Sequence, residues 1–159
     1  MDRKINIDLS GIYNELNNKT ILVTGAGGSI GSEICKQILH YKPSTIILLD
    51  NTEYNLYKIT NELSTFLDNH SLNINLVSKL TSVVNKDRIE QIFNNYKPDI
   101  IFHAAAYKHL PIVENNIIEA VTNNVFGTLN IIEMAKKYKS KKLILISTDK
   151  AVRSTSVMG

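Results

Sequence analysis

The sequence predicts an α/β protein built on a doubly wound parallel sheet. Short apolar runs and longer amphipathic runs alternate four times along the 159 residues, which is the pattern of strands joined by crossover helices. The expected strands are apolar throughout, as strands covered on both faces must be. A glycine-rich stretch, TGAGGSIG, lies between the first strand and the first long helix.

The first half of the chain is expected to hold three strands and two helices. Thr20–Thr24 is a β-branched run that ends at a glycine, and Thr45–Asp50 is a second apolar run. Residues 29–41 and 53–67 carry apolar side chains at helical spacing, and residues 73–77 form a weaker third strand.

The second half continues the alternation with helices at Lys86–Tyr96 and 117–138 and strands at 99–103 and 143–147. In the long helix, the side chains expected to face the sheet are those of Val121, Val125, Leu129 and Ile132. The resulting fold is of Rossmann type, with the expected strand order 3-2-1-4-5. Residues 1–18 are expected to form a capping arm, and residues 19–159 the Rossmann domain.

Composition excludes several classes of protein. The chain is 43% hydrophobic and 21% charged, as ordinary globular domains are, and its net charge of +3 does not favour nucleic acid as a partner. The single cysteine, Cys35, excludes a disulfide framework and a cysteine-type zinc site, and no metal site is expected. No run approaches the ~20 apolar residues that span a bilayer, so a cytoplasmic location is expected.

The glycine-rich stretch is the first candidate binding site. Gly25, Gly28 and Gly31 are spaced three apart, between a strand and a helix that begins near Ser29 and Ile30. Glycine lets the chain turn sharply and lets its backbone approach a pyrophosphate, which the N–H groups of the helix then bind. A bare turn without a ligand is the alternative.

The end of the second strand is the next candidate. Asp50 follows Gly31 by 19 residues, and Asn51 comes directly after it. A carboxylate at this point can accept hydrogen bonds from an adenosine ribose, and it would repel a 2′-phosphate, which favours NAD over NADP. The alternative is that Asp50 only caps the next helix.

Polar and small residues follow the later strands. Ala104, Ala105 and Ala106 would let a flat cofactor lie against the backbone, and Asn124 is an amide inside a helix, where such groups usually have a specific partner. The segment 147–150 brings an acid and a base to the carboxyl edge of the sheet, where such sheets bind ligands. A helix cap with surface charge is the alternative for that segment.

Taken together, five blocks resemble the CapD-like polysaccharide biosynthesis family of nucleoside-diphosphate-sugar 4,6-dehydratases, within the extended short-chain dehydrogenase/reductase superfamily. The blocks are TGAGGSIGSEICKQI, LLDNTEYNLYKI, FHAAAYKHLPIVE, NNVFGTLNIIEMAKK and ISTDKAVRSTSVMG. They follow one another at the family's spacing along nearly the whole chain.

The resemblance implies a mechanism in which bound NAD⁺ takes hydride from C4 of a UDP-sugar and returns it to C6 after water is lost. It implies Lys150 as the base at C5, Asp149 as the acid at the C6 hydroxyl and Thr148 as the hydrogen-bond partner of O4. Lys108 would reach the substrate. The residues implied to bind the cofactor are Gly25, Gly28, Ser29, Ile30, Gly31, Asp50, Asn51, Ala104, Ala105, Ala106, Asn124 and Ser147.

The sequence departs from the superfamily pattern at two positions. Met158 stands where a catalytic tyrosine would begin the Tyr-x-x-x-Lys pair. The resemblance places Met there in the long, membrane-anchored members, shifts the chemistry onto Asp149 and Lys150, and favours UDP-N-acetylglucosamine with retention at C5. Ser82 replaces an aspartate that would hold the adenine amine, so that contact is in doubt.

The last strands and the substrate lobe of the family are absent, so the chain is expected to be an inactive piece of a larger, possibly membrane-anchored parent. The resemblance also implies a homo-oligomer joined along the 117–138 helix, with Ile118 and Met134 exposed. Two alternatives stay open. One is a C5-inverting dehydratase or a 4-epimerase, and the other is a non-catalytic dinucleotide-binding module.

Overall fold

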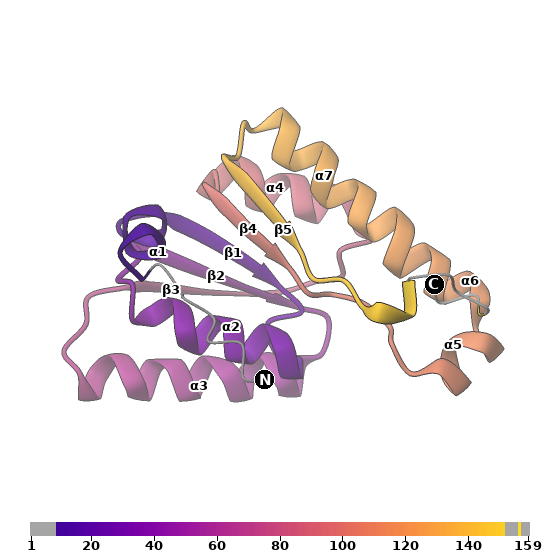
Figure 1. Ribbon diagram of the computed structural model, residues 1–159, viewed down its shortest axis with the longest axis horizontal. Coiled ribbons are helices and arrows are strands. Elements are labelled where there is room, and N and C mark those ends of the chain that lie inside the picture. Colours follow the sequence, from indigo (N-terminus) through magenta and orange to yellow (C-terminus); the bar gives the residue numbers. More distant parts are fainter. Residues whose placement is uncertain (1–8, 152–155, 157–159) are drawn as a thin grey trace, which may run out of the picture.

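The computed structural model of the protein describes residues 9–151 and 156. A five-stranded parallel sheet with the strand order β3-β2-β1-β4-β5 lies at its centre (Figure 1), which confirms the expected fold class and order. The strands are β1 (Thr20–Thr24), β2 (Thr45–Asp50), β3 (Asn75–Leu80), β4 (Ile100–His103) and β5 (Lys142–Leu145).

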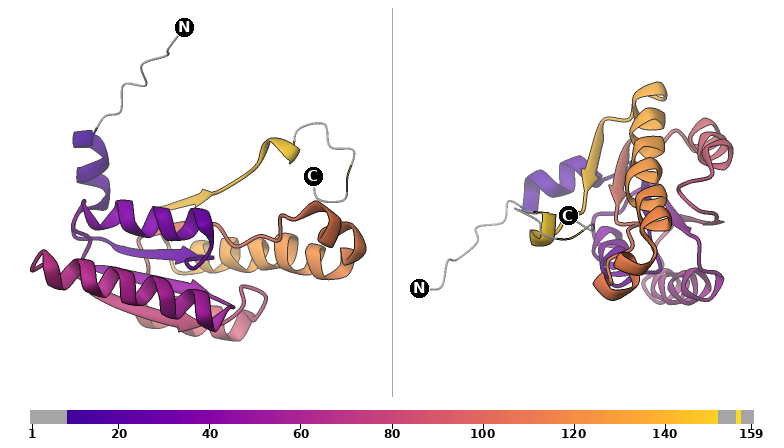
Figure 2. Two further views of the ribbon diagram at one scale, coloured as in Figure 1. Left: turned by 90° about the horizontal axis from the view of Figure 1, so that it is seen from below. Right: turned by 90° about the vertical axis from the view of Figure 1, so that its right-hand side faces the viewer.

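Helices cover both faces of the sheet, with α2 and α3 on one side and α4 and α7 on the other (Figures 1 and 2). The helices are α1 (Leu9–Leu16), α2 (Ser29–Leu39), α3 (Glu53–Asn69), α4 (Lys86–Tyr96), α5 (Leu110–Asn115), α6 (Ile117–Val121) and α7 (Gly127–Lys137). A π-helical turn, η1 (Thr122–Phe126), joins α6 to α7, and a 3-10 turn, η2 (Asp149–Ala151), follows β5.

Side chains of successive strand residues pack into two separate hydrophobic cores, one on each face of the sheet. Ile46 and Leu48 pack with α2 and α3, whereas Ile47 and Leu49 pack with α4 and α7. Because side chains alternate across a strand, a sheet with both faces covered needs apolar residues at every position. This is the physical reason for the unbroken apolar runs in the sequence.

The amino-terminal arm is helical over Leu9–Leu16. Leu16 is buried, and Ile12 packs against the core that α2 and α3 cover. The segment 1–8 of the expected arm lies outside the described residues.

The expected single helix over 117–138 is wrong in two respects. It is interrupted by η1, and it turns a different face to the sheet. The four residues expected to face inward are exposed by 37% to 48%, whereas Met134, expected outside, is 4% exposed. Ile118 is 77% exposed, as expected.

Gly127, at the start of α7, lies against the loop between β3 and α4. A Cβ on Gly127 would lie 2.6 Å from Cγ2 of Val83, so the helix sits too close for a side chain there. The buried residues of this helical stretch include Ala120, Asn123 and Ile131, and a second apolar stripe is left exposed. Apolar periodicity alone could not choose between the two stripes.

Two smaller differences affect the site. The short helix α5 was not expected, and it lies beside the carboxyl edge of the sheet (Figure 1). Strand β5 ends at Leu145, so Ser147 lies beyond the strand rather than within it.

Candidate functional site

A cavity of about 180 Å³ opens at the carboxyl edge of the sheet. The segments that follow β1, β2, β3 and β4 all contribute to its wall, as expected where the crossovers of a doubly wound sheet diverge. The lining residues are Gly25, Gly28, Leu49, Asp50, Asn51, Thr52, Asn55, Thr81, Val83, Ala104, Ala105, Ala106, Tyr107 and Asn123. Seven of these residues are among those that the sequence analysis predicted to bind the cofactor.

The glycine-rich turn is packed against its own backbone. Gly25 has a φ of +65°, and a Cβ there would lie 2.7 Å from the carbonyl oxygen of Ala104. A Cβ on Gly31 would lie 2.0 Å from the carbonyl oxygen of Gly25. These two positions therefore require glycine, and the segments after β1 and β4 touch through their main chains.

Helix α2 begins at this turn with no side-chain cap. Its N-cap residue is Gly28, and Ser29 and Ile30 in its first turn are exposed. The first N–H groups of a helix have no acceptor within it, and they carry the positive end of the helix dipole. The start of α2 can therefore bind an anionic group such as a pyrophosphate.

Asp50 connects the turn to the next crossover. Its Oδ2 accepts a hydrogen bond from the backbone N–H of Gly27 at 2.9 Å, and its Oδ1 accepts one from Thr52 at 2.8 Å. The residue is 6% exposed. The carboxylate thus holds the residue that precedes α3 and also borders the cavity. The Gly27 contact is long-range, and sequence reasoning missed it.

The segment after β3 closes the cavity beside Asp50. The hydroxyl of Ser82 accepts a hydrogen bond from the Val84 N–H at 3.2 Å, within its own turn. Thr81 and Val83 line the cavity instead. Ser82 thus serves the local turn, and its neighbours supply the wall.

Asn124 fixes the opposite wall. Its Oδ1 accepts from the Tyr107 N–H at 2.8 Å, and its Nδ2 donates to the Tyr107 carbonyl at 2.9 Å. Asn123, one residue earlier, lines the cavity and donates to Asn124 Oδ1 at 3.0 Å. The amide expected to have a specific partner therefore holds the segment after β4, and its neighbour borders the cavity.

The residues expected to carry the chemistry follow β5. Thr148 and Asp149 are exposed, and the Thr148 hydroxyl donates to Asp149 Oδ1 at 3.1 Å. Lys150 belongs to η2, but the role expected of its side chain, like the role expected of Met158, lies outside what the structure describes. Ser147 is exposed and does not line the cavity.

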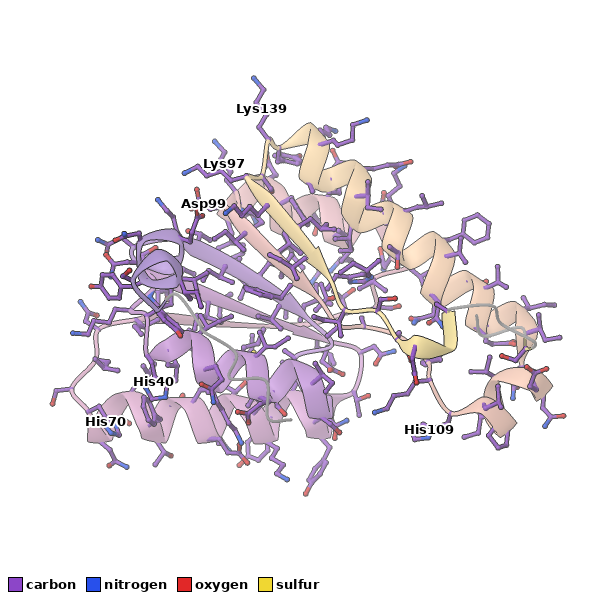
Figure 3. All side chains as sticks on the ribbon, in the orientation of Figure 1. His40, His70, Lys97, Asp99, His109 and Lys139 are labelled. Carbon is purple, nitrogen blue, oxygen red and sulfur yellow. The ribbon has the colours of Figure 1, made fainter. Side chains whose placement is uncertain are left out.

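A second cavity, of about 430 Å³, adjoins the first and shares Ala106 and Tyr107 with it. Lys108 and His109 border it. Figure 3 shows His109 near α5, whereas His40 and His70 lie at the far ends of α2 and α3. Lys108 therefore lies on the wall of a cavity that adjoins the first one.

Comparison with known proteins identifies the family. A family model described as "Polysaccharide biosynthesis protein" matches residues 21–159. The chain belongs to this polysaccharide biosynthesis family. The CapD-like resemblance of the five sequence blocks is thereby confirmed.

Two relatives show how much of a family member the chain represents. It is 48% identical over 155 residues to the capsular polysaccharide biosynthesis protein CapD of Staphylococcus aureus, covering 98% of this chain and 25% of CapD. It is 32% identical over 144 residues to an inverting UDP-N-acetylglucosamine 4,6-dehydratase of Campylobacter jejuni, covering 90% of this chain and 40% of that enzyme. The chain thus spans a quarter to two-fifths of these proteins.

Solved structures agree with the fold. Pen from Bacillus thuringiensis matches with a TM-score of 0.80 at 32% identity, covering 91% of this chain and 42% of Pen. WbmG from Bordetella bronchiseptica, solved in complex with NAD and UDP, matches with a TM-score of 0.66 at 26% identity, covering 81% of this chain and 37% of WbmG. In the part of the chain that the structure describes, no helix combines the length and apolarity needed to cross a membrane.

Proposed function

We propose that this chain is the NAD-binding part of a nucleotide-sugar 4,6-dehydratase, a lyase that acts on UDP-N-acetylglucosamine in surface glycan synthesis. The cavity at the carboxyl edge carries the proposal, because it joins a glycine turn, an uncapped helix start and a buried carboxylate. The relative named as a UDP-N-acetylglucosamine 4,6-dehydratase and the neighbour solved with NAD and UDP support the ligand classes.

The residues around Asp50 favour NAD over NADP. Its carboxylate borders the cavity together with the uncharged side chains of Asn51, Thr52 and Asn55, and among the described residues no lysine or arginine lines this cavity. A 2′-phosphate placed beside the carboxylate would meet like charge with no cation to offset it.

Each remaining residue has a distinct part in the proposed reaction. Bound in the cavity, the nicotinamide cofactor supplies a hydride acceptor and donor. Thr148 hydrogen-bonds O4 of the sugar, Lys150 takes the C5 proton and Asp149 gives a proton to the departing C6 hydroxyl. Lys108, on the adjoining cavity, contacts the substrate.

Calorimetric titration of the chain with NAD and NADP tests the cofactor site. Asp50→Ala removes the acceptor of two backbone N–H groups and is expected to weaken NAD binding by about tenfold or more. Asp68→Ala, the same change at an exposed position on α3, is the matched control and should leave binding unchanged. Failure of the unaltered chain to bind NAD would refute the proposed cofactor site.

Retention at C5 is part of the proposal, and Met158 supports it, since the residue stands where the family resemblance has a catalytic tyrosine. The relative named as an inverting enzyme favours the alternative of inversion. The longer protein, given UDP-N-acetylglucosamine, should yield a 4-keto-6-deoxy product whose C5 configuration NMR reads directly. A 4-epimer in place of that product would replace the dehydratase with an epimerase.

A non-catalytic module remains the alternative from another class. Such a module would bind NAD and ignore a UDP-sugar, so titrating the NAD-loaded longer protein with UDP-N-acetylglucosamine separates the two. The proposed homo-oligomer is also testable. It would use the exposed stripe of Ile118, Val121, Val125, Leu129 and Ile132, and light scattering should show a smaller mass after Val125→Glu.

A further inference from the structure

We propose that His103 is a positioning residue of the dinucleotide cavity, acting as a neutral imidazole that carries its proton on Nε2. In this role it ties α7 to the sheet edge from which the glycine turn and the segment after β4 leave. The inference rests on the proposed function, because the cavity it shapes is the one assigned to NAD.

His103 is the last residue of β4, and it is 2% exposed. Its Nδ1 lies 2.6 Å from the hydroxyl of Thr24, the last residue of β1, and its Nε2 lies 2.9 Å from the hydroxyl of Thr128 in α7. One imidazole thus joins two neighbouring strands to the helix that covers them.

Counting donors fixes which ring nitrogen holds the proton. The Thr128 hydroxyl donates its one hydrogen to the backbone carbonyl of Asn124, at 2.6 Å, since a carbonyl can only accept. Thr128 must therefore accept from His103, which places a hydrogen on Nε2. Burial lowers the pKa of His103 to about 4, so the ring is neutral near pH 7 and its Nδ1 accepts from Thr24.

Three of the four residues in this chain of hydrogen bonds are next in sequence to a residue that lines the cavity. Thr24 precedes Gly25, and His103 precedes the alanines at 104–106. Asn124, at the far end, holds Tyr107 through both of its amide atoms. The network therefore ties together the segments after β1 and β4 and the π-helical turn η1.

Gly25 shows how closely the two walls meet. A Cβ there would lie within 2.9 Å of three main-chain atoms of Ala104 and Ala105, so the walls already touch. Backbone pairing of β1 with β4 fixes the distance between these strands. The imidazole adds the bond to Thr128, and this bond holds α7 and the π-helical turn η1 against the two walls.

Thr128→Val tests the inference in the chain as it stands. Valine keeps the shape of threonine but leaves the Nε2 hydrogen and the Asn124 carbonyl without their partner. NAD binding measured by calorimetry should weaken by about tenfold. Thr128→Ser keeps the hydroxyl and should restore binding to near the original level.

Thr60→Val is the matched control. The Thr60 hydroxyl donates to the carbonyl of Leu56 at 2.7 Å, the same bond four residues back along a helix, but on α3 and away from the cavity. Its loss should leave NAD binding unchanged. Equal weakening by both valine variants, or none by Thr128→Val, would overturn the inference.

A measurement on the unaltered chain is independent of variants and of NAD. The ¹⁵N spectrum of His103 at pH 7 should show a bare Nδ1 and a protonated Nε2. The opposite tautomer, or a charged ring, would overturn the inference even where NAD binds well. Conversely, absence of NAD binding with the expected tautomer would refute the proposed function and, with it, the positioning role, while leaving the hydrogen-bond assignment intact.

Discussion

Gly31→Ala is the sharpest test of how the glycine turn is built. The new Cβ would lie 2.0 Å from the carbonyl oxygen of Gly25 and 2.7 Å from its carbonyl carbon. Both atoms are main chain, so relief requires α2 to move away from the turn. Overpacking of this kind costs about 3 kcal/mol, and the better helix propensity of alanine offsets about 1 kcal/mol of it.

The expected net loss is therefore about 2 kcal/mol of unfolding free energy, or roughly 4–8 °C in Tm for a chain of this length. Urea and thermal unfolding measure it, and calorimetry should show NAD binding weakened at the same time. Gly28→Ala is the matched control. Its Cβ would lie 3.2 Å from the same Gly25 oxygen, and its backbone angles suit any residue, so a loss below about 1 kcal/mol is expected.

The reasoning fails if Gly31→Ala is as stable as the original chain, or if Gly28→Ala is the more damaging of the two. Either result would mean that α2 and the turn separate without cost. The close packing on which the candidate site depends would then not exist.

Three further predictions concern titrating groups. Burial raises the pKa of the Cys35 thiol to about 12, so a thiol reagent at pH 8 should modify it only after denaturation; rapid labelling of the native chain would contradict this. Burial also raises the pKa of Asp99, but the hydrogen bond from the Thr20 N–H and the Lys141 ammonium outweigh it and leave the pKa below its ordinary value. The resulting stabilisation is present above about pH 4 and is lost as the pH falls, so Asp99→Asn should cost more stability at pH 7 than at pH 3, by urea unfolding. The pKa of His103, lowered by burial to about 4, adds stability that is complete above about pH 6.5 and declines toward pH 4. The urea midpoint of the original chain should therefore fall between about pH 6.5 and pH 4, and this fall should be smaller in His103→Gln. An equal fall in both chains would contradict a buried, neutral imidazole.

Much of the fold was readable from the chain alone. The sheet order and most strand and helix positions agree with the expectation, because period and apolarity are local properties of the sequence. The glycine turn and Asp50 were also predictable, since both follow strands whose carboxyl ends meet at one edge.

The sequence did not predict which side of the helical stretch 117–138 would be buried. Two apolar stripes run along residues 117–138, and the buried face includes Gly127, which lies against Val83. Val83 is far away in the sequence, so this contact leaves no local signal. The turn η1 within this helix likewise carried no local signal in the sequence.

The sequence by itself determined the order of strands and helices, the glycine turn and the carboxylate beside it, because each follows from residues adjacent in the chain. Only the tertiary structure decided that Asp50 binds Gly27 and that His103 bridges Thr24 and Thr128. Those contacts join residues 23 to 79 positions apart. Their geometry arises only when parallel strands bring distant segments to a common edge.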